Sequence, residues 1–224
     1  MHIYIHTRIY IELNDVSQII TNAFYTKPNQ RPWKGIFKLS ELNRLQQNFP
    51  YNKDEECHEM FVAIRRRQQT TNNDDDDDQD TVIGFVDIDG RALPPEKEKM
   101  FPPRPYLSDL AVDTDHRRKG IARSLVEHCH EYLINFYNND KRNNDESDGE
   151  GSKITQNDDT EDKSAVGVYI RVAKDNEAAV QLYTQPPSSL STATSCLDYQ
   201  IIKEEKDKTL GDVWLLYKNL SSST

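Results

Sequence analysis

The stretch from residue 106 to residue 136 constrains the fold of this chain more than any other part of it. Its first segment, Tyr106–Asp113, is short and apolar. From Gly120 onward apolar side chains recur at helical spacing, namely Ile121, Leu125, Val126, Cys129, Leu133 and Phe136. The pattern therefore predicts a strand, a tight turn and an amphipathic helix.

The turn between this strand and helix has the properties of an anion site. The first N–H groups of a helix have no intrahelical acceptor, and the helix dipole places positive charge behind them. Gly120 lets the backbone approach a ligand closely, and Ala122 leaves the next turn unobstructed. Basic side chains here oppose the dipole and are unfavourable without a bound anion; they are Arg117, Arg118, Lys119 and Arg123. A phosphate group is the ligand that this arrangement favours.

The same turn resembles a known signature. Arg117-x-x-Gly120-x-Ala122 is similar to the (Gln/Arg)-x-x-Gly-x-(Gly/Ala) motif of the GNAT acetyltransferase superfamily, and the expected Leu-Ala-Val strand precedes it. The chain has neither the P-loop pattern nor the Gly-x-Gly-x-x-Gly pattern of a dinucleotide fold. Of the phosphate-site motifs, only the GNAT signature therefore matches.

A second motif strengthens the resemblance. The predicted strand Val168–Val172 is followed by Asn176-x-x-Ala179-x-x-Leu182-Tyr183, similar to the family's Asn-x-x-Ala-x-x-Leu-Tyr. The resemblance covers about residues 14–220. In one departure, residues 184–196 separate this motif from 197–199 (Leu-Asp-Tyr), which looks like a displaced counterpart of the family's Leu-Gly-Phe turn.

The resemblance implies an α/β fold, the GNAT fold, with a single twisted mixed sheet of about six to seven strands and helices on both faces. The expected order is β-α-α-β-β-β-α-β-α-β-β. Strands are expected at 3–12, 60–64, 82–88, 106–113, 168–172, 199–203 and 213–217. We expect Asn14 or Asp15 to cap a first helix that ends near residue 25. After a loop at 27–34, Ser40 is expected to cap a second helix with Leu42, Leu45 and Phe49 facing inward.

Charge and length indicate one domain. The 224 residues suffice for one well-buried core, so residues 1–224 are expected to form a single acetyltransferase domain. The net charge of −10 lies mainly in two polar insertions, 68–80 with −6 and 138–163 with −5, so the other 185 residues carry +1. Both insertions are nearly free of large apolar side chains, which predicts disorder.

The resemblance implies acetyl-coenzyme A (acetyl-CoA) as the acetyl donor and an amine as the acceptor. The cofactor-binding residues would be the strand segment Leu110, Ala111 and Val112, the turn Arg117, Arg118, Lys119, Gly120, Ile121, Ala122 and Arg123, and Asn176. The turn would hold the pyrophosphate and the strand would pair with the pantetheine arm. A backbone N–H near Val112 would stabilise the oxyanion. Capping of the last helix alone would also explain Asn176.

The resemblance also implies two catalytic residues. The amine would attack the thioester directly, and Tyr183 would protonate the departing thiolate. An ordinary core tyrosine is the alternative for Tyr183. Asp109, the nearest carboxylate, is the candidate base, although its direction is open because side chains alternate along a strand. The amine could instead lose its proton to solvent through water.

The sequence leaves three functions open. The favoured one is acetylation of a protein N-terminus or lysine, because 106–112 and 117–122 look especially like plastid-type protein acetyltransferases of the superfamily. A small-amine, polyamine-type acetyltransferase and a non-catalytic acyl-CoA-binding regulatory module are the alternatives. Nucleic-acid binding is not expected, since the basic cluster is small and the chain is acidic.

The expected partners are therefore acetyl-CoA and an amine acceptor, with no metal and no membrane. Three cysteines, Cys57, Cys129 and Cys196, lie far apart without metal-ligand spacing and suit a reducing compartment. We expect a cytoplasmic location, or a plastid one if a transit peptide is missing from this chain.

Overall fold

The computed structural model describes residues 2–6, 12–25, 28–49, 56–66, 80–98, 101–145, 166–184, 197–207 and 211–221. The predicted insertion at 68–80 lies outside these residues except for Asp80, and so do residues 146–163 of the second one. The chain divides into two compact units, 1–92 with 106–129 and 93–105 with 130–224.

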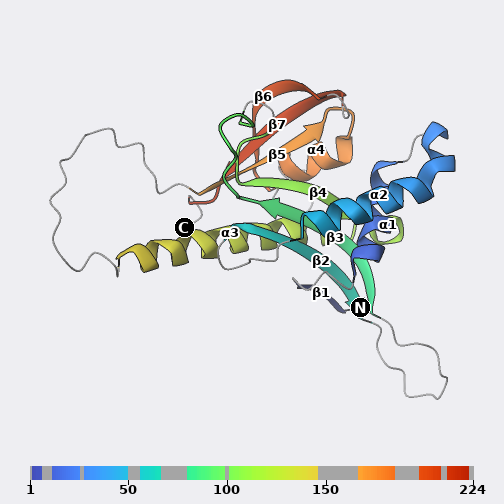
Figure 1. The fold of residues 1–224 in the computed structure, drawn as a ribbon, viewed down its shortest axis with the longest axis horizontal. Helices are drawn as coiled ribbons and strands as arrows, with labels where there is room; N and C mark the ends of the chain where they lie inside the picture. The colour runs from blue at the N-terminus through green and yellow to red at the C-terminus, as the bar shows by residue number, and fades with distance from the viewer. Residues whose placement is uncertain are drawn as a thin grey trace, which may run out of the picture. The chain divides into compact units, whose positions relative to one another are not determined.

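The order of strands and α-helices agrees with the predicted order, element for element (Figure 1). In the first unit the elements are β1 (His2–His6), α1 (Leu13–Phe24), the 3₁₀ helix η1 (Pro28–Trp33), α2 (Lys34–Gln47), β2 (His58–Arg66), β3 (Thr81–Asp89), β4 (Tyr106–Val112), the 3₁₀ turn η2 (Thr114–His116) and the first part of α3 (Ile121–Asp145). In the second unit the rest of α3 is followed by β5 (Gly167–Ala173), α4 (Glu177–Thr184), β6 (Gln200–Asp207) and β7 (Gly211–Asn219).

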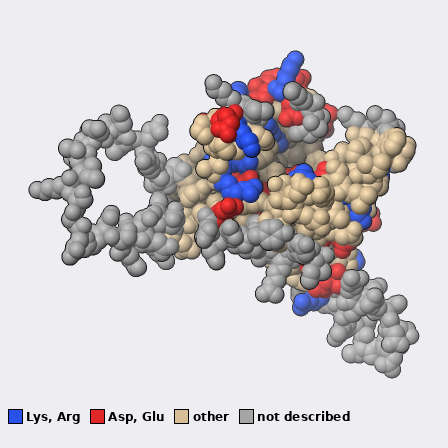
Figure 2. All heavy atoms as spheres, viewed as in Figure 1, with Lys and Arg blue, Asp and Glu red and all other residues tan. Residues whose placement is uncertain are grey.

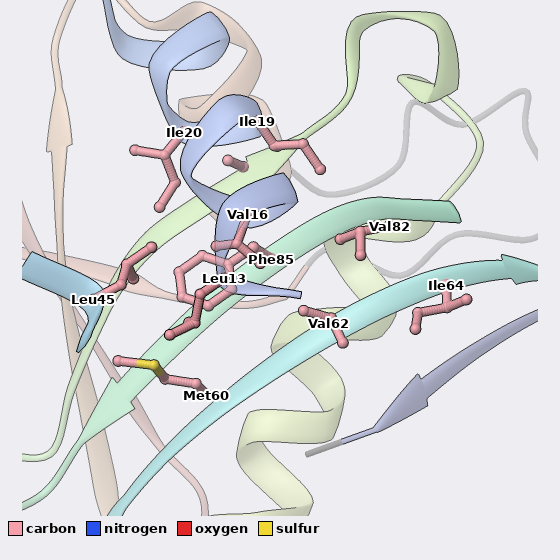
Figure 3. Packing of buried hydrophobic residues seen from close by; sticks show 11 residues of the cluster. Leu13, Val16, Ile19, Ile20, Leu45, Met60, Val62, Ile64, Val82 and Phe85 are labelled. Atoms are coloured by element: carbon pink, nitrogen blue, oxygen red, sulfur yellow. The ribbon is translucent and has the colours of Figure 1, made fainter. Parts of the chain in front are cut away.

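The first unit is built on an antiparallel run of four strands, β1-β2-β3-β4. β2 and β3 are buried along most of their length and consist largely of apolar residues. One of their faces packs against α1 and α2. The core there, shown in Figure 3, comprises Leu13, Val16, Ile19, Ile20, Leu45, Met60, Val62, Ile64, Val82, Phe85 and Ala111. As predicted, Leu45 is buried and Leu42 and Phe49 pack against this core.

The first turns of α3 cover the opposite face of these strands. A Cβ added at Gly84 of β3 would lie 3.0 Å from Ile121 Cγ2 and 3.1 Å from Leu125 Cδ1. Phe61 of β2 meets the His128 ring edge-on, with the ring centroids 4.7 Å apart. Helices therefore lie on both faces of this sheet, as the sequence predicted.

In the second unit β7 pairs with both β5 and β6, and all these pairs are antiparallel. Apolar residues of β5 and β7 form the buried side, namely Val168, Ile170, Val172, Val213, Leu215 and Leu216. β6 is exposed along most of its length, which is typical of an edge strand carrying alternating charges.

Three predicted boundaries are wrong. Glu12 rather than Asn14 or Asp15 occupies the N-cap of α1, so both predicted caps lie in its first turn. Ser40 lies inside α2, which begins six residues earlier because η1 leads directly into it. α3 continues to Asp145 and covers the first eight residues of the predicted second insertion; once a helix has formed, each further residue adds a hydrogen bond.

None of the described helices combines the length and the apolar character needed to cross a membrane.

Candidate active site

The turn from Asp113 to Gly120 has the backbone that the phosphate-site prediction requires. Arg118 and Gly120 have positive φ angles of 62° and 83°. Ser124 N–H donates to Gly120 O at 3.0 Å, and this bond starts the hydrogen-bond ladder of α3, so the N–H groups of 120–123 have no intrahelical acceptor. A Cβ added at Gly120 would meet no atom of the described residues within 4 Å. The space beside Gly120 can therefore admit a ligand.

Three of the four predicted cations, Arg117, Lys119 and Arg123, make weak contacts at the turn. Arg117 Nε donates to Val112 O at 3.1 Å, and Lys119 Nζ donates to Asp115 O at 2.9 Å. Arg123 lies 3.5 Å from the Glu127 carboxylate. Exposed contacts of this kind contribute little stability, so these side chains can turn to a phosphate at small cost.

A buried histidine ties the turn to the sheet. Asp113 Oδ1 accepts from Asp115 N at 3.0 Å and lies 2.8 Å from His116 Nδ1. On its other side, His116 Nε2 lies 3.2 Å from a guanidinium nitrogen of Arg65. Because Arg65 can only donate, Nε2 accepts and the ring hydrogen sits on Nδ1, facing Asp113. Burial acts to raise the pKa of Asp113, but the bonds from His116 and Asp115 and the charges of His116 and Arg117 together outweigh it, so the pKa is lowered overall.

A β-bulge in β4 decides where Asp109 points. Phe85 pairs with Ala111 and Asp87 pairs with Ser108, so one β3 residue faces two on β4, Asp109 and Leu110. Asp109 takes a positive φ of 55°, and bulges of this kind redirect side chains. The direction that the sequence left open is thereby settled: Asp109 faces α2.

On α2, Arg44 connects two carboxylates. One of its terminal nitrogens lies 2.7 Å from Asp109 Oδ2 and 2.7 Å from Glu41 Oε2. Tyr25, at the end of α1, donates its hydroxyl hydrogen to Glu41 Oε1 at 2.6 Å. Sequence reasoning missed Glu41, Arg44 and Tyr25. The only local signal was the spacing of Glu41 and Arg44, which places them on one helix face.

The surroundings of Asp109 change its acidity. Burial raises its pKa from 3.8 to about 6, the nearby Asp87 and Glu41 act in the same direction, and Arg44 opposes them. A carboxyl group with this pKa is mostly ionised at pH 7 and binds a proton more readily than an ordinary aspartate. That combination is what a general base requires.

The segment of β4 predicted to bind the cofactor, residues 110–112, comes directly after Asp109 in the sequence. Ala111 points into the core against α1, whereas Leu110 and Val112 are half-buried. Val112 pairs with Gly84 of β3.

Tyr183 and Asn176 lie in the second unit. Tyr183 is 1% exposed and packs edge-to-face on Tyr199, with ring centroids 5.2 Å apart. Asn176 caps α4, because its Oδ1 accepts from Ala179 N at 3.2 Å. The capping role considered for Asn176 is thus confirmed, while a cofactor role remains a prediction.

The segment after α4 supports the comparison with the family's Leu-Gly-Phe turn. Asp198 has a positive φ of 56°, a conformation that glycine adopts most readily. Tyr199 N donates to Tyr183 O at 3.0 Å, and the Tyr199 hydroxyl lies 2.8 Å from His130 Nε2. Burial, aided by Lys218, lowers the pKa of His130 to about 4, so its neutral ring accepts the tyrosine hydrogen near pH 7.

The comparisons with known proteins agree with the motifs. Residues 36–144 match the profile of the Acetyltransferase (GNAT) family. The chain thus carries a domain of the GNAT acetyltransferase family: it is an N-acetyltransferase that uses acetyl-CoA and acts on an amine. The α/β fold class predicted from the sequence is confirmed, with seven strands and four α-helices among the described residues. No curated protein sequence matches the chain.

Several solved structures are similar at low sequence identity. An aminoglycoside 6'-N-acetyltransferase complexed with coenzyme A is 10% identical, with a TM-score of 0.46 over 98% of this chain and 97% of that one. A GNAT-family acetyltransferase from Staphylococcus aureus Mu50 is 15% identical, with a TM-score of 0.46 over 98% and 99%. A glucosamine-6-phosphate N-acetyltransferase from Arabidopsis thaliana is 10% identical, with a TM-score of 0.36 over 71% and 100%.

Proposed function

We propose that this enzyme acetylates a primary amine of a protein, an N-terminal α-amine or a lysine side chain, by direct attack in a ternary complex. The observation that carries this choice of acceptor is a group of exposed apolar side chains on α1, η1 and α2. The group comprises Phe24, Trp33, Ile36 and Leu39, which are 45%, 56%, 59% and 67% exposed. We call these four residues the apolar acceptor surface.

The apolar acceptor surface lies on the same elements as Tyr25, Glu41 and Arg44, which connect to Asp109. Tyr25 follows Phe24, and Glu41 and Arg44 continue α2 beyond Leu39. In Figure 2 the surface over α2 carries few charged side chains. Exposed apolar groups of this size favour contact with another protein over contact with water. A peptide acceptor can cover them, whereas a small, highly charged polyamine cannot.

Acetyl-CoA supplies the thioester whose acetyl group is transferred. The open turn around Gly120 fits its phosphates, with the N–H groups of Gly120, Ile121 and Ala122 as donors and Arg117, Arg118, Lys119 and Arg123 as cations. We assign the pantetheine arm to the β4 backbone at Leu110, Ala111 and Val112.

Two side chains would move protons. Asp109 accepts the proton of the attacking amine, directly or through water, because its raised pKa makes it a suitable base. Tyr183 donates its hydroxyl hydrogen to the departing thiolate, as its place in the motif implies. Asn176 would orient the cofactor or the backbone beside it.

The acceptor proposal is tested by steady-state kinetics on two substrate sets, short peptides with apolar first residues and polyamines. Trp33→Ala and Leu39→Ala should raise KM for peptides about tenfold, roughly 1.4 kcal/mol each, and leave KM for polyamines unchanged. Ile202→Ala is the matched control, because Ile202 is a 50% exposed apolar side chain on β6. Preference for polyamines, with no effect of Trp33→Ala or Leu39→Ala, would establish the small-amine alternative instead.

A cytoplasmic location is the remaining part of the proposal. It is supported by Cys57 and Cys129, which are both buried and form no disulfide within the part of the chain that the structure describes. Fluorescence microscopy of the tagged chain in its source cells tests it, and accumulation in plastids would overturn it.

A further inference from the structure

A second buried carboxylate lies next to Asp109 and takes no part in the chemistry assigned above. Asp87 of β3 is 8% exposed and uses both of its oxygens. Its Oδ1 lies 2.9 Å from Nε2 of His58 on β2, and its Oδ2 accepts a hydrogen bond from Ser108 Oγ on β4 at 3.1 Å. Three adjacent strands therefore hold this one carboxylate in place.

The hydrogen bonds suit an ionised Asp87. A carboxylate accepts hydrogen bonds through both oxygens and donates none, so His58 must present a hydrogen on Nε2 and Ser108 must present its hydroxyl hydrogen. His58 is 1% exposed, and its Nδ1 is buried with no hydrogen-bond partner among the residues that the structure describes. A buried nitrogen without a partner lowers the stability of the folded protein. Stability alone therefore does not explain why a histidine is buried at position 58.

The bulge brings this group to the proposed base. Asp87 pairs in register with Ser108, and Ser108 is the residue that precedes Asp109. The charged groups that face Asp109 are Arg44 and Glu41 from α2 and Asp87 from β3. Arg44 lowers the proton affinity of Asp109, and the two carboxylates raise it. On Asp109, the charge of Arg44 is thus opposed by the charges of two carboxylates, Asp87 and Glu41.

We propose that Asp87, fixed by His58 and Ser108, is a positioning residue for Asp109 whose negative charge keeps Asp109 an effective base beside Arg44. The inference rests on the proposed role of Asp109 in acetyl transfer. Without Asp87, Arg44 would hold Asp109 as a weakly basic carboxylate, which would accept the proton of the amine less readily.

The test is Asp87→Asn, because asparagine keeps the shape of the side chain and can still bond to His58 and Ser108. The acidic limb of kcat/KM against pH should move to lower pH by about one unit, and kcat on the plateau should fall several-fold with KM for the acceptor nearly unchanged. Asp89→Asn is the matched control. Asp89 is equally buried on β3, but Arg91 bonds to both of its oxygens, and its strand partner is Tyr106.

A direct titration separates failure of this inference from failure of the proposed base. Carbon-13 NMR of the labelled aspartate carboxyl groups follows Asp109 without any turnover, with Asp109→Asn identifying its signal. The Asp109 midpoint should fall in Asp87→Asn and stay in Asp89→Asn. An unmoved midpoint in a folded Asp87→Asn protein would overturn the inference and leave the base role intact. An acidic limb that persists in Asp109→Asn would refute the base role itself. If Asp87→Asn does not fold, Asp87→Ser makes the same charge change and carries the same prediction.

Discussion

Replacement of Asp109 by asparagine should change how the stability of this protein depends on pH. The pKa of Asp109 is raised from 3.8 to about 6, so the folded state favours the neutral acid more than the unfolded chain does. The resulting stabilisation is complete below about pH 4 and is lost as pH rises through 6. Asparagine stays neutral throughout and lacks this dependence.

The magnitude follows from the shift. Two pKa units at 1.36 kcal/mol each correspond to about 3 kcal/mol. The free energy of unfolding of the wild type minus that of Asp109→Asn should therefore fall by about 3 kcal/mol between pH 4 and pH 7. The side chain of Asp109 is 22% exposed, so solvent screening reduces this value only moderately.

Urea unfolding of both proteins, followed by circular dichroism at half-unit steps of pH, measures this difference directly. Subtracting one plot of unfolding free energy against pH from the other removes the contribution of every group that titrates equally in both proteins. A difference that stays constant, or that grows as pH rises, would show that Asp109 is not a buried carboxyl of raised pKa. The argument for its role as a base would then fail.

Further predictions concern three other residues. Tyr183→Phe should lower kcat and leave the affinity for acetyl-CoA nearly unchanged; equal turnover in rapid-mixing assays would remove the hydroxyl from the mechanism. Asp198→Gly should stabilise the protein by about 0.5–1 kcal/mol in urea unfolding, because glycine adopts the φ of 56° without strain, and a loss of stability would contradict this explanation. His116→Leu should raise KM for acetyl-CoA several-fold, since it removes the bonds to Asp113 and Arg65 that hold the turn; an unchanged KM would show that the turn keeps its shape without them.

The order of the elements could be predicted because apolar periodicity is strong where the core is. β2 and β3 are buried almost continuously, and the buried apolar residues of α3 recur at helical spacing, so the type of each element is clear from the sequence. The start of α2 could not be predicted. Ile36 and Leu39, near its start, are exposed, so they do not mark a buried face, and Gly35 argues against a helix.

The site was predictable only where a motif is local in sequence. Gly120 and the cations beside it lie within seven residues, and the turn has the expected backbone. The contact between Arg44 and Asp109 joins residues 65 positions apart, and nothing in either segment indicates the other. The direction of Asp109 depends on a bulge, which alternation along a strand does not reveal. Asp87, by contrast, can be recognised from the sequence as unusual, because it is a charged residue within a mainly apolar strand.

Binding of acetyl-CoA, measured by isothermal titration calorimetry, tests the central assignment most directly. Gly120→Glu should weaken binding at least 100-fold, about 3 kcal/mol, because its carboxylate would lie where the phosphates are expected. Gly211→Glu is the matched control: Gly211 also has a positive φ, 80°, and no atom of the described residues within 4 Å of its Cβ position, so the substitution causes the same backbone strain in a different segment of the chain, the start of β7. Loss of binding in Gly120→Glu alone is the predicted result. Equal affinity in the two folded variants would show that the turn at 117–123 does not hold acetyl-CoA.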